Sequence, residues 1–269
     1  MNAPAEQDAG PRVIVRREGT TGWIVFSNKA RLNAMTYEMW KAVPQAVAQH
    51  VADPEVRVVV FTGDGEQAFV SGADISQFEA MRADADARAA YDRALEAAYA
   101  AMLACPKPTI ARITGICVGG GLGMSLNCDL RVCSDDSVFR MPAGRLGLGY
   151  AIDGVKRMVD VIGPANTADL FYTARKFDAA YAVKIGFVNH CHPRIGFDAL
   201  FAEYVATISA NAPLTLRAAK EAMKALAQDE SARDLRAFQA AFEACFTSED
   251  YAEGRRAFLE KRQPQFKGR

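Results

Sequence analysis

The chain lacks a charge excess of either sign and any long hydrophobic run. Its 269 residues contain 32 Lys and Arg against 32 Asp and Glu, so the formal net charge at pH 7 is zero. A protein with that balance has no overall electrostatic attraction for nucleic acid or for an anionic membrane surface. No stretch approaches the roughly 18 consecutive apolar residues that a membrane-spanning helix needs. We therefore expect neither a nucleic-acid partner nor a membrane partner.

Cysteine and histidine are both sparse, and neither forms a recognisable metal-binding pattern. His190 and His192 alternate along a predicted strand end and so share one face, but the sequence offers no third ligand nearby. No cysteine belongs to a Cys-x-x-Cys pair, which favours reduced core thiols over disulfides or a zinc site. The six cysteines are Cys105, Cys117, Cys128, Cys133, Cys191 and Cys245. We therefore predict no metal site.

The N-terminus lacks the basic and then apolar pattern of a secretory signal. Residues 1–11 are small and polar, which predicts a disordered tail and a cytoplasmic protein. At about 150 residues per domain, the length is compatible with one large domain or with one domain and an appendage.

Hydrophobic periodicity predicts an alternation of strands and helices from residue 12 to residue 196. The expected unit is two strands followed by a helix, and it recurs about four times, which indicates an α/β fold of stacked repeats. Strands are predicted at residues 13–17, 22–27, 56–62, 109–114 and 129–134, with a short hairpin around Phe139. Helices are predicted at residues 36–51, 74–81 and 86–104, the first capped by Thr36.

Beyond residue 196 the pattern becomes helical only. Helices are predicted at residues 197–210, 213–227, 231–246 and 248–262. Their apolar residues recur at helical spacing and need a partner surface; they include Leu216, Met223, Leu226, Leu235, Phe238, Phe242, Phe246 and Phe258. We therefore predict a core at residues 12–196 and a C-terminal helical oligomerisation module at residues 197–269.

Two glycine-containing segments carry the clearest functional signal. They are Phe69-Val-Ser-Gly-Ala-Asp-Ile-Ser76 and Gly115-Ile-Cys-Val-Gly-Gly-Gly-Leu-Gly-Met-Ser-Leu-Asn-Cys-Asp129. Each places glycine beside a predicted helix start, where unpaired backbone N–H groups can converge on a developing negative charge. Packing explains the run Gly119–Gly121 poorly, because each glycine costs about 1 kcal/mol in a helix.

These segments resemble the two oxyanion-hole segments of the crotonase (enoyl-CoA hydratase/isomerase) superfamily. The resemblance extends along most of the chain, through residues 28–35, 171–174, 182–189 and 248–262. It implies a crotonase-like spiral of repeated ββα units with a C-terminal helical subdomain, assembled as a homotrimer or homohexamer. It also implies an acyl-CoA substrate, with coenzyme A arriving as part of the thioester and no permanently bound cofactor.

The resemblance assigns roles to individual residues. The backbone N–H groups of Ala73 and Gly120 would form the oxyanion hole. Phe258 and Lys261 would reach coenzyme A, often from a neighbouring subunit, although Lys261 is equally well explained as a solvated charge. The remaining coenzyme side of the groove would be lined by Lys29, Ala30, Ala73, Asp74, Ile75 and Ser76.

The chain departs from the hydratase pattern at the two acid–base positions. Hydratases of this superfamily carry glutamate where this chain has Gly123 and Ala143. Neither glycine nor alanine can transfer a proton, and hydration of an enoyl thioester needs both a base and an acid. The usual two-glutamate hydration, and isomerisation by a single glutamate at the Ala143 position, are therefore not expected.

Other residues offer alternative chemistry. Residues 141–154 are similar to the corresponding hairpin of methylmalonyl-CoA decarboxylases, in which a tyrosine matches Tyr150; those enzymes, however, have histidine at the Ala73 position. Decarboxylation needs no base, because departing carbon dioxide leaves the enolate. Tyr150 is alternatively a packing aromatic, and Asp153 either caps a helix or transfers a proton. Arg140 and Arg145 either meet an acidic acyl group or face solvent.

Three classes of function stay open on this evidence. The first is an acyl-CoA enzyme that forms a thioester enolate and uses an unusual proton-transfer group. The second is a decarboxylase of a malonyl-type thioester, and the third is a noncatalytic acyl-CoA-binding protein; a hydrolase using Asp153 is a weaker alternative. The two intact glycine segments favour catalysis, because binding alone does not require two donors directed at one oxygen.

Overall fold

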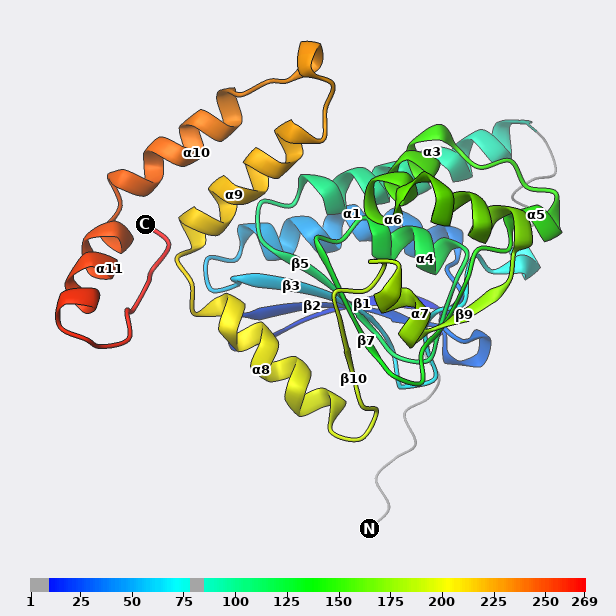
Figure 1. Cartoon of the computed structure of the whole chain (residues 1–269). Helices are drawn as coiled ribbons and strands as arrows, with labels where there is room; N and C mark the ends of the chain where they lie inside the picture. Colours follow the sequence, from blue (N-terminus) through cyan, green and yellow to red (C-terminus); the bar gives the residue numbers. More distant parts are fainter. Residues whose placement is uncertain (1–9, 78–84) are drawn as a thin grey trace.

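The computed structural model describes residues 10–77 and 85–269 and has a mixed α/β architecture (Figure 1). Six strands form a larger sheet in the order β1-β2-β3-β5-β7-β10, and four form a smaller sheet in the order β4-β6-β8-β9. The strands are β1 (Arg12–Glu18), β2 (Thr21–Ser27), β3 (Val58–Gly63), β4 (Ala68–Val70), β5 (Thr109–Ile113), β6 (Ile116–Val118), β7 (Leu130–Ser134), β8 (Val138–Arg140), β9 (Lys176–Asp178) and β10 (His190–His192).

β1 and β2 both lie in the larger sheet, whereas the pairs β3 and β4, β5 and β6, and β7 and β8 each place one strand in each sheet before a helix, which produces a spiral. The first strands of successive repeats pair in parallel in the larger sheet, and the second strands pair in parallel in the smaller sheet. The helices that follow them are α3 (Ala85–Ala104), α4 (Gly120–Leu126), α5 (Ala143–Leu146), α6 (Ile152–Thr173) and, after β9, α7 (Ala179–Lys184). The predicted spiral of ββα units is confirmed.

Both faces of the larger sheet are covered, which explains the composition of its central strand. β3 reads Val-Val-Val-Phe-Thr-Gly and is buried at every position, as expected for a parallel strand between two layers. Val59 and Phe61 join the core that includes α1 (Tyr37–Ala52). Val58 and Val60 point to the opposite face and pack with α8 (Phe197–Ser209). The strand is therefore hydrophobic throughout rather than alternating.

Two local predictions are wrong, the hairpin around Phe139 and the start of the helix at residue 231, and a third is described only in part. Within the helix predicted at residues 74–81, the described residues form only the 3-10 turn η2 (Ile75–Gln77), and residues 78–81 lie outside the described part of the chain. No hairpin forms around Phe139, because β8 pairs in parallel with β6 and antiparallel with the distant β9. The helix predicted from residue 231 begins only after the turn η3 (Glu230–Ala232). Residues 1–9 of the predicted tail also lie outside the described residues.

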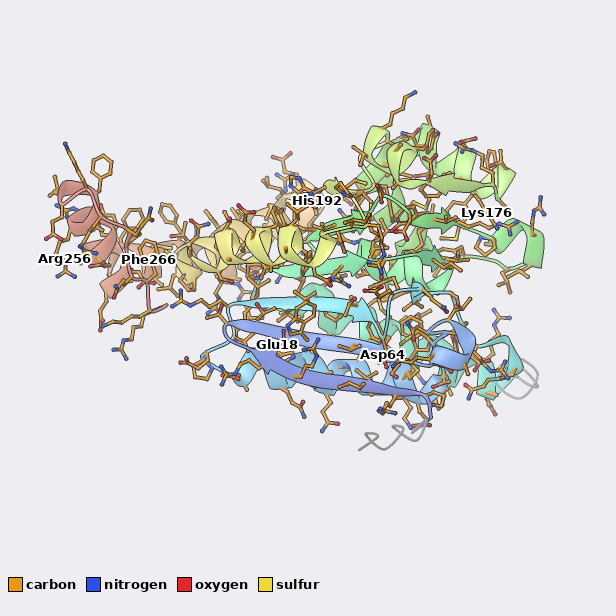
Figure 2. The ribbon with its side chains drawn as sticks, turned by 90° about the horizontal axis from the view of Figure 1, so that it is seen from below. Glu18, Asp64, Lys176, His192, Arg256 and Phe266 are labelled. Atoms are coloured by element: carbon orange, nitrogen blue, oxygen red, sulfur yellow. The ribbon has the colours of Figure 1, made fainter. Side chains whose placement is uncertain are left out.

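The C-terminal helices form an arm that leaves the two sheets (Figure 1). It consists of α9 (Pro213–Leu226), α10 (Arg236–Phe246) and α11 (Glu249–Leu259). Figure 2 shows Arg256 near the end of this arm and Lys176 at the opposite end of the molecule. Four aromatic rings contact one another in series along the arm. The centroid distances are 5.7 Å between Phe238 and Phe242, 5.0 Å between Phe242 and Phe246, and 5.6 Å between Phe246 and Tyr251.

All six cysteines are free thiols, and four of them are buried. Burial raises the pKa of the Cys117, Cys128 and Cys133 thiols, which keeps them unreactive at neutral pH. Within residues 10–77 and 85–269, no helix is long and apolar enough to cross a membrane. The same residues contain no group of three His, Cys, Asp or Glu that could hold a metal ion.

We propose that residues 197–269 are an oligomerisation module, because Phe242 and Phe246 are about half exposed in the single chain. Burying such a patch against another subunit removes apolar surface from water. Light scattering should give the mass of a trimer or hexamer, and replacing both phenylalanines by aspartate should reduce it. The matched control is Ile195→Asp, since Ile195 is 93% exposed outside the arm. A wild-type monomer at micromolar concentration would contradict the proposal.

Candidate active site

The two glycine segments lie side by side because the strands before them are neighbours. β4 and β6 pair in parallel, so the loops that leave their carboxyl ends emerge at the same edge of the smaller sheet. A methyl group placed on Gly120 would lie 3.7 Å from the backbone nitrogen of Ala73, and one on Gly119 would lie 3.9 Å from the Cα of Gly72. The structure therefore brings both predicted oxyanion-hole positions together.

Both predicted donors have unpaired N–H groups within the described residues. Met35 donates its N–H to the carbonyl of Gly72 at 2.8 Å and accepts from the N–H of Asp74 at 2.9 Å, which fixes the backbone on either side of Ala73. Ala73 itself donates to no described group. Gly120 is the first residue of α4, where a helix N–H has no intrahelical acceptor. The two unpaired N–H groups therefore belong to backbone segments that lie close together.

Each of the three consecutive glycines has to be explained separately. Gly119 has a φ of +54°, a left-handed conformation that favours glycine. Gly121 has no space for a side chain, because a methyl group there would lie 2.2 Å from the carbonyl oxygen of Val70. A methyl group on Gly120 would make only ordinary contacts, the nearest at 3.4 Å from Trp40. Packing explains Gly121 and backbone conformation explains Gly119, but neither explains Gly120.

Two tyrosine hydroxyls occupy the space beside Gly123, where hydratases carry a glutamate. A methyl group on Gly123 would lie 2.7 Å from the Oη of Tyr99 and 3.0 Å from the Oη of Tyr150. Tyr99 comes from α3 and donates a long hydrogen bond of 3.4 Å to the carbonyl of Gly120. Tyr150 precedes α6, and its ring packs edge-on against Phe171 at 5.3 Å. Two neutral phenols therefore replace one carboxylate.

Both phenols are held in their neutral form. Burial raises the pKa of Tyr150 to about 12. The pKa of Tyr99 is raised well above its usual value, first by burial and then by the proximity of Tyr150 and Tyr91. At neutral pH each hydroxyl therefore keeps its proton and can donate a hydrogen bond.

Tyr99 was not predicted from the sequence. Its position follows from an aromatic cluster between α1 and α3, in which Trp40 contacts the Tyr99 ring edge-on at 5.7 Å and donates its indole N–H to Tyr91 at 2.9 Å. Tyr91 and Tyr99 are eight residues apart, a spacing that places both on one helix face. The spacing could have indicated that the two tyrosines share a face of α3. It does not indicate which part of the protein that face contacts.

The second hydratase position is also without a carboxylate. Ala143 is buried at the start of α5, directly after Pro142. Pro142 borders the second glycine segment, since its Cδ would lie 3.7 Å from a methyl group on Gly119.

Arg140 donates its Nε to the carbonyl of Ala174 at 2.8 Å, and Arg145 is exposed on α5.

Asp153 does not cap α6. The N-cap position is occupied by Ala151, which makes no side-chain cap, and the helix-capping interpretation of Asp153 is therefore wrong. Asp153 is exposed in the first turn, where a negative charge is favourable to the helix dipole. The next residue, Gly154, allows the Tyr150 ring to pack closely, because a methyl group there would lie 2.6 Å from the ring. Proton transfer by Asp153 stays a prediction.

The predicted coenzyme-side residues belong to two segments that are hydrogen-bonded to each other, residues 28–35 and residues 71–77. Residues 28–35 are tied to the first glycine segment by the N–H of Ser71, which donates to Leu32 at 3.1 Å. Lys29 lies on the turn η1 (Lys29–Arg31) and pairs with Asp64 at 3.3 Å, while Ala30 is exposed. The buried Asp74 carboxylate accepts from both the N–H and the hydroxyl of Ser76. Ile75 begins η2.

Phe258 and Lys261 are not brought to the glycine segments within one chain. Phe258 is 83% exposed on α11, and Lys261 follows the end of that helix with a φ of +53°. α11 lies at the far end of the C-terminal arm from α5 (Figure 1). A role for either residue at coenzyme A therefore requires a neighbouring subunit and stays a prediction.

A separate open groove of about 780 Å³ lies between α8 and strands β1 to β3. Its lining includes Glu18 and Asp64, both labelled in Figure 2, together with Trp23 and Phe201. None of the predicted catalytic or coenzyme-binding residues lines this groove. The groove is therefore distinct from the candidate site at the glycine segments.

Comparison with known proteins establishes the family. The family model described as enoyl-CoA hydratase/isomerase matches residues 16–269, so the chain belongs to the enoyl-CoA hydratase/isomerase family. The chain is 32% identical to the "Probable enoyl-CoA hydratase echA8" of Mycobacterium tuberculosis, over 94% of this chain and 97% of that protein. It is 29% identical to the short-chain-enoyl-CoA hydratase of Clostridium acetobutylicum, over 96% and 98%.

A solved structure confirms the crotonase fold. The enoyl-CoA hydratase/carnithine racemase of Magnetospirillum magneticum superimposes with a TM-score of 0.90 at 32% identity, covering 96% of each chain. The sequence-based resemblance to the crotonase superfamily is thereby confirmed.

The contact between Gly123 and the two hydroxyls yields a stability prediction. Gly123→Ala should lower the free energy of unfolding by about 1–3 kcal/mol, because the new methyl group overlaps both oxygens. The triple variant Gly123→Ala, Tyr99→Phe, Tyr150→Phe removes both obstacles and should recover most of that loss in a urea unfolding experiment. Equal destabilisation in the single and triple variants would show that the hydroxyls do not meet at Gly123.

Proposed function

We propose that the protein is an acyl-CoA enzyme that stabilises a thioester enolate between the backbone N–H groups of Ala73 and Gly120. The observation that supports the proposal is the proximity of these two N–H groups, which follow adjacent parallel strands and have no acceptor within the described residues. Fixed donors aimed at a developing oxyanion lower the barrier because they need no reorganisation during the reaction. A binding protein without catalysis has no need of this arrangement.

Hydration and base-initiated isomerisation are poorly supported by the site. Gly123 and Ala143 offer no carboxylate, and the nearby Tyr150 has a pKa of about 12. At pH 7 only about one Tyr150 in 10⁵ would be ionised, so it is a poor base for water or for an α-proton. The same phenol is a competent acid for an enolate.

Decarboxylation of a malonyl-type thioester is the reaction that best fits a site with acids and no base. The bond between the α-carbon and the carboxylate breaks, its electron pair forms the enolate, and carbon dioxide leaves. The enolate oxygen accepts hydrogen bonds from Ala73 and Gly120, and the α-carbon takes the proton of the Tyr150 hydroxyl. Water then reprotonates the Tyr150 phenolate. The position of Tyr150 Oη beside Gly123, one helical turn from Gly120, is the observation that favours this reaction.

The remaining parts of the proposal concern binding and assembly. Lys29, Ala30 and Asp74 to Ser76 would line the coenzyme side of the substrate site at the glycine segments. Coenzyme A would arrive only as part of the thioester. Phe258 and Lys261 would come from a neighbouring subunit of a trimer or hexamer. Asp153 would be the next proton-transfer candidate if Tyr150 proved unnecessary.

Gly120→Pro tests the oxyanion hole directly. Proline is well tolerated at the first position of a helix, so this change removes one N–H donor without breaking α4. Turnover should fall by at least about 10²-fold, as expected for loss of one oxyanion donor. Activity is measured by mass detection of the products of crotonyl-, 3-enoyl-, malonyl- and methylmalonyl-CoA. A folded variant with unchanged turnover would refute the assignment, and circular dichroism controls for folding.

The reaction itself is tested by comparing substrates. We expect loss of carbon dioxide from malonyl- or methylmalonyl-CoA, and a crotonyl-CoA hydration rate about 10²–10⁴ below that of a two-glutamate relative. Tyr150→Phe should slow decarboxylation by about 10²-fold. Efficient hydration by the unmodified protein would contradict this choice of reaction and would direct attention to Asp153.

The pH dependence follows from the neutral phenol. The active form of Tyr150 is protonated, so its contribution is complete at neutral pH and is lost only as pH rises toward its pKa of about 12. We expect kcat for decarboxylation to be level between pH 6 and pH 9, measured with saturating malonyl-CoA. A fall in kcat toward low pH within that range would indicate a base and would contradict the assignment.

A further inference from the structure

The turn that carries the Gly120 donor is not fixed by side chains of its own. Gly119, Gly120 and Gly121 are consecutive, and glycine has the largest backbone freedom of any residue. An oxyanion donor must hold its position, because a misplacement of about 1 Å near the reacting atoms can cost about 10²-fold in rate. Groups outside this turn must therefore hold it in place.

Two groups from other elements border the turn. A methyl group on Gly121 would lie 2.2 Å from the carbonyl oxygen of Val70, at the end of β4. A methyl group on Gly120 would lie 3.4 Å from the Cζ2 atom of Trp40, which comes from α1. The residue that carries the donor is therefore bordered by an indole ring.

Trp40 is fixed in turn by two tyrosines of α3. It is only 1% exposed, and its indole N–H donates to the hydroxyl of Tyr91 at 2.9 Å. The Tyr99 ring meets the indole edge-on at a centroid distance of 5.7 Å, and the Tyr99 hydroxyl donates to the carbonyl of Gly120 at 3.4 Å. A buried indole N–H without an acceptor would be costly, so the hydrogen bond to Tyr91 favours one orientation of the ring.

The same short part of the chain also holds the other donor. Met35 lies just before α1, and its backbone bonds to the carbonyl of Gly72 and to the N–H of Asp74, on either side of Ala73. Trp40 belongs to the first turn of α1. One segment at the start of this helix therefore contacts the backbone at both proposed donors.

We propose that Trp40 is a positioning residue for the Gly120 donor, and that Tyr91 holds Trp40 in the required orientation. The indole transfers no proton and acts only through the backbone of Gly120. It keeps the first turn of α4 at a fixed distance from Ala73, so that both N–H groups can reach one oxygen. The inference rests on the proposed function, because it concerns the geometry of the proposed oxyanion hole.

Tyr91→Phe tests this role, because it keeps the ring and removes the acceptor of the indole N–H. We expect kcat for malonyl-CoA decarboxylation to fall about tenfold with KM unchanged, since the donor acts on the developing enolate. In the Gly120→Pro background the same change should have no further effect, because the donor that Trp40 positions is absent. Tyr172→Phe, which removes a hydroxyl from a residue that is 87% exposed, is the matched control and should leave kcat unaltered. Additive losses in Tyr91→Phe and Gly120→Pro would overturn the proposal, since a purely structural role would not depend on the donor.

A nuclear magnetic resonance measurement separates failure of this inference from failure of the proposed function. In protein isotopically labelled at its glycine nitrogens, the Gly120 amide signal is the one that Gly120→Pro removes, and it senses the ring current of the adjacent indole. Tyr91→Phe should shift this signal, and Tyr172→Phe should not. An unmoved signal in Tyr91→Phe would overturn the role of Trp40 even if the protein decarboxylates malonyl-CoA. A wild type that turns over no thioester would overturn the proposed function, while the signal would still decide whether Tyr91 and Trp40 position Gly120.

Discussion

The close approach of β4 to the start of α4 is the contact on which the rest of the site depends. Gly121 lies against the carbonyl of Val70 so tightly that even a methyl group would reach 2.2 Å from that oxygen. Any larger residue would push α4 away from β4 and would separate Gly120 from Ala73. Met35 fixes the other side by holding the carbonyl of Gly72 and the N–H of Asp74. The proposed oxyanion hole would therefore be a product of backbone packing, formed by N–H groups and not by side chains.

The groups that would act on the enolate at the candidate site are hydrogen-bond donors, and none of them carries a charge. Ala73 and Gly120 present N–H groups, and Tyr99 and Tyr150 present neutral hydroxyls whose pKa values are raised by burial. A buried carboxylate without a partner would be costly and would oppose a negative charge on the substrate. Phenols avoid that cost because they stay neutral. An arrangement of donors alone favours an anionic substrate or an anionic intermediate, which is the common feature of the decarboxylation and enolate proposals.

The sequence predicted what local backbone chemistry dictates and missed what depends on tertiary packing. The spiral fold, the two glycine segments and the Thr36 cap were predictable, because periodicity and glycine reflect local requirements. Tyr99 was missed because the alanine-rich pattern of α3 does not reveal which face meets α4. The hairpin at Phe139 was wrong because the partner of β8 is β9, which lies beyond α6. Phe258 and Lys261 lie on the C-terminal arm, away from the glycine segments of the same chain, so a role at the site depends on assembly and not on local sequence.

The contacts at Gly123 also explain why the acid–base chemistry cannot be changed one residue at a time. A glutamate at position 123 would bring its first carbon within 3.0 Å of both hydroxyls, so it cannot coexist with Tyr99 and Tyr150 in their present positions. Conversely, removing the hydroxyls without adding a carboxylate would remove the proposed proton donor beside α4. The residues at positions 99, 123 and 150 therefore have to change together, because a side chain at position 123 would overlap both hydroxyls. If the proposed oxyanion hole is correct, a chain could keep both glycine segments and still differ in reaction, according to what fills the space beside the fourth residue of α4.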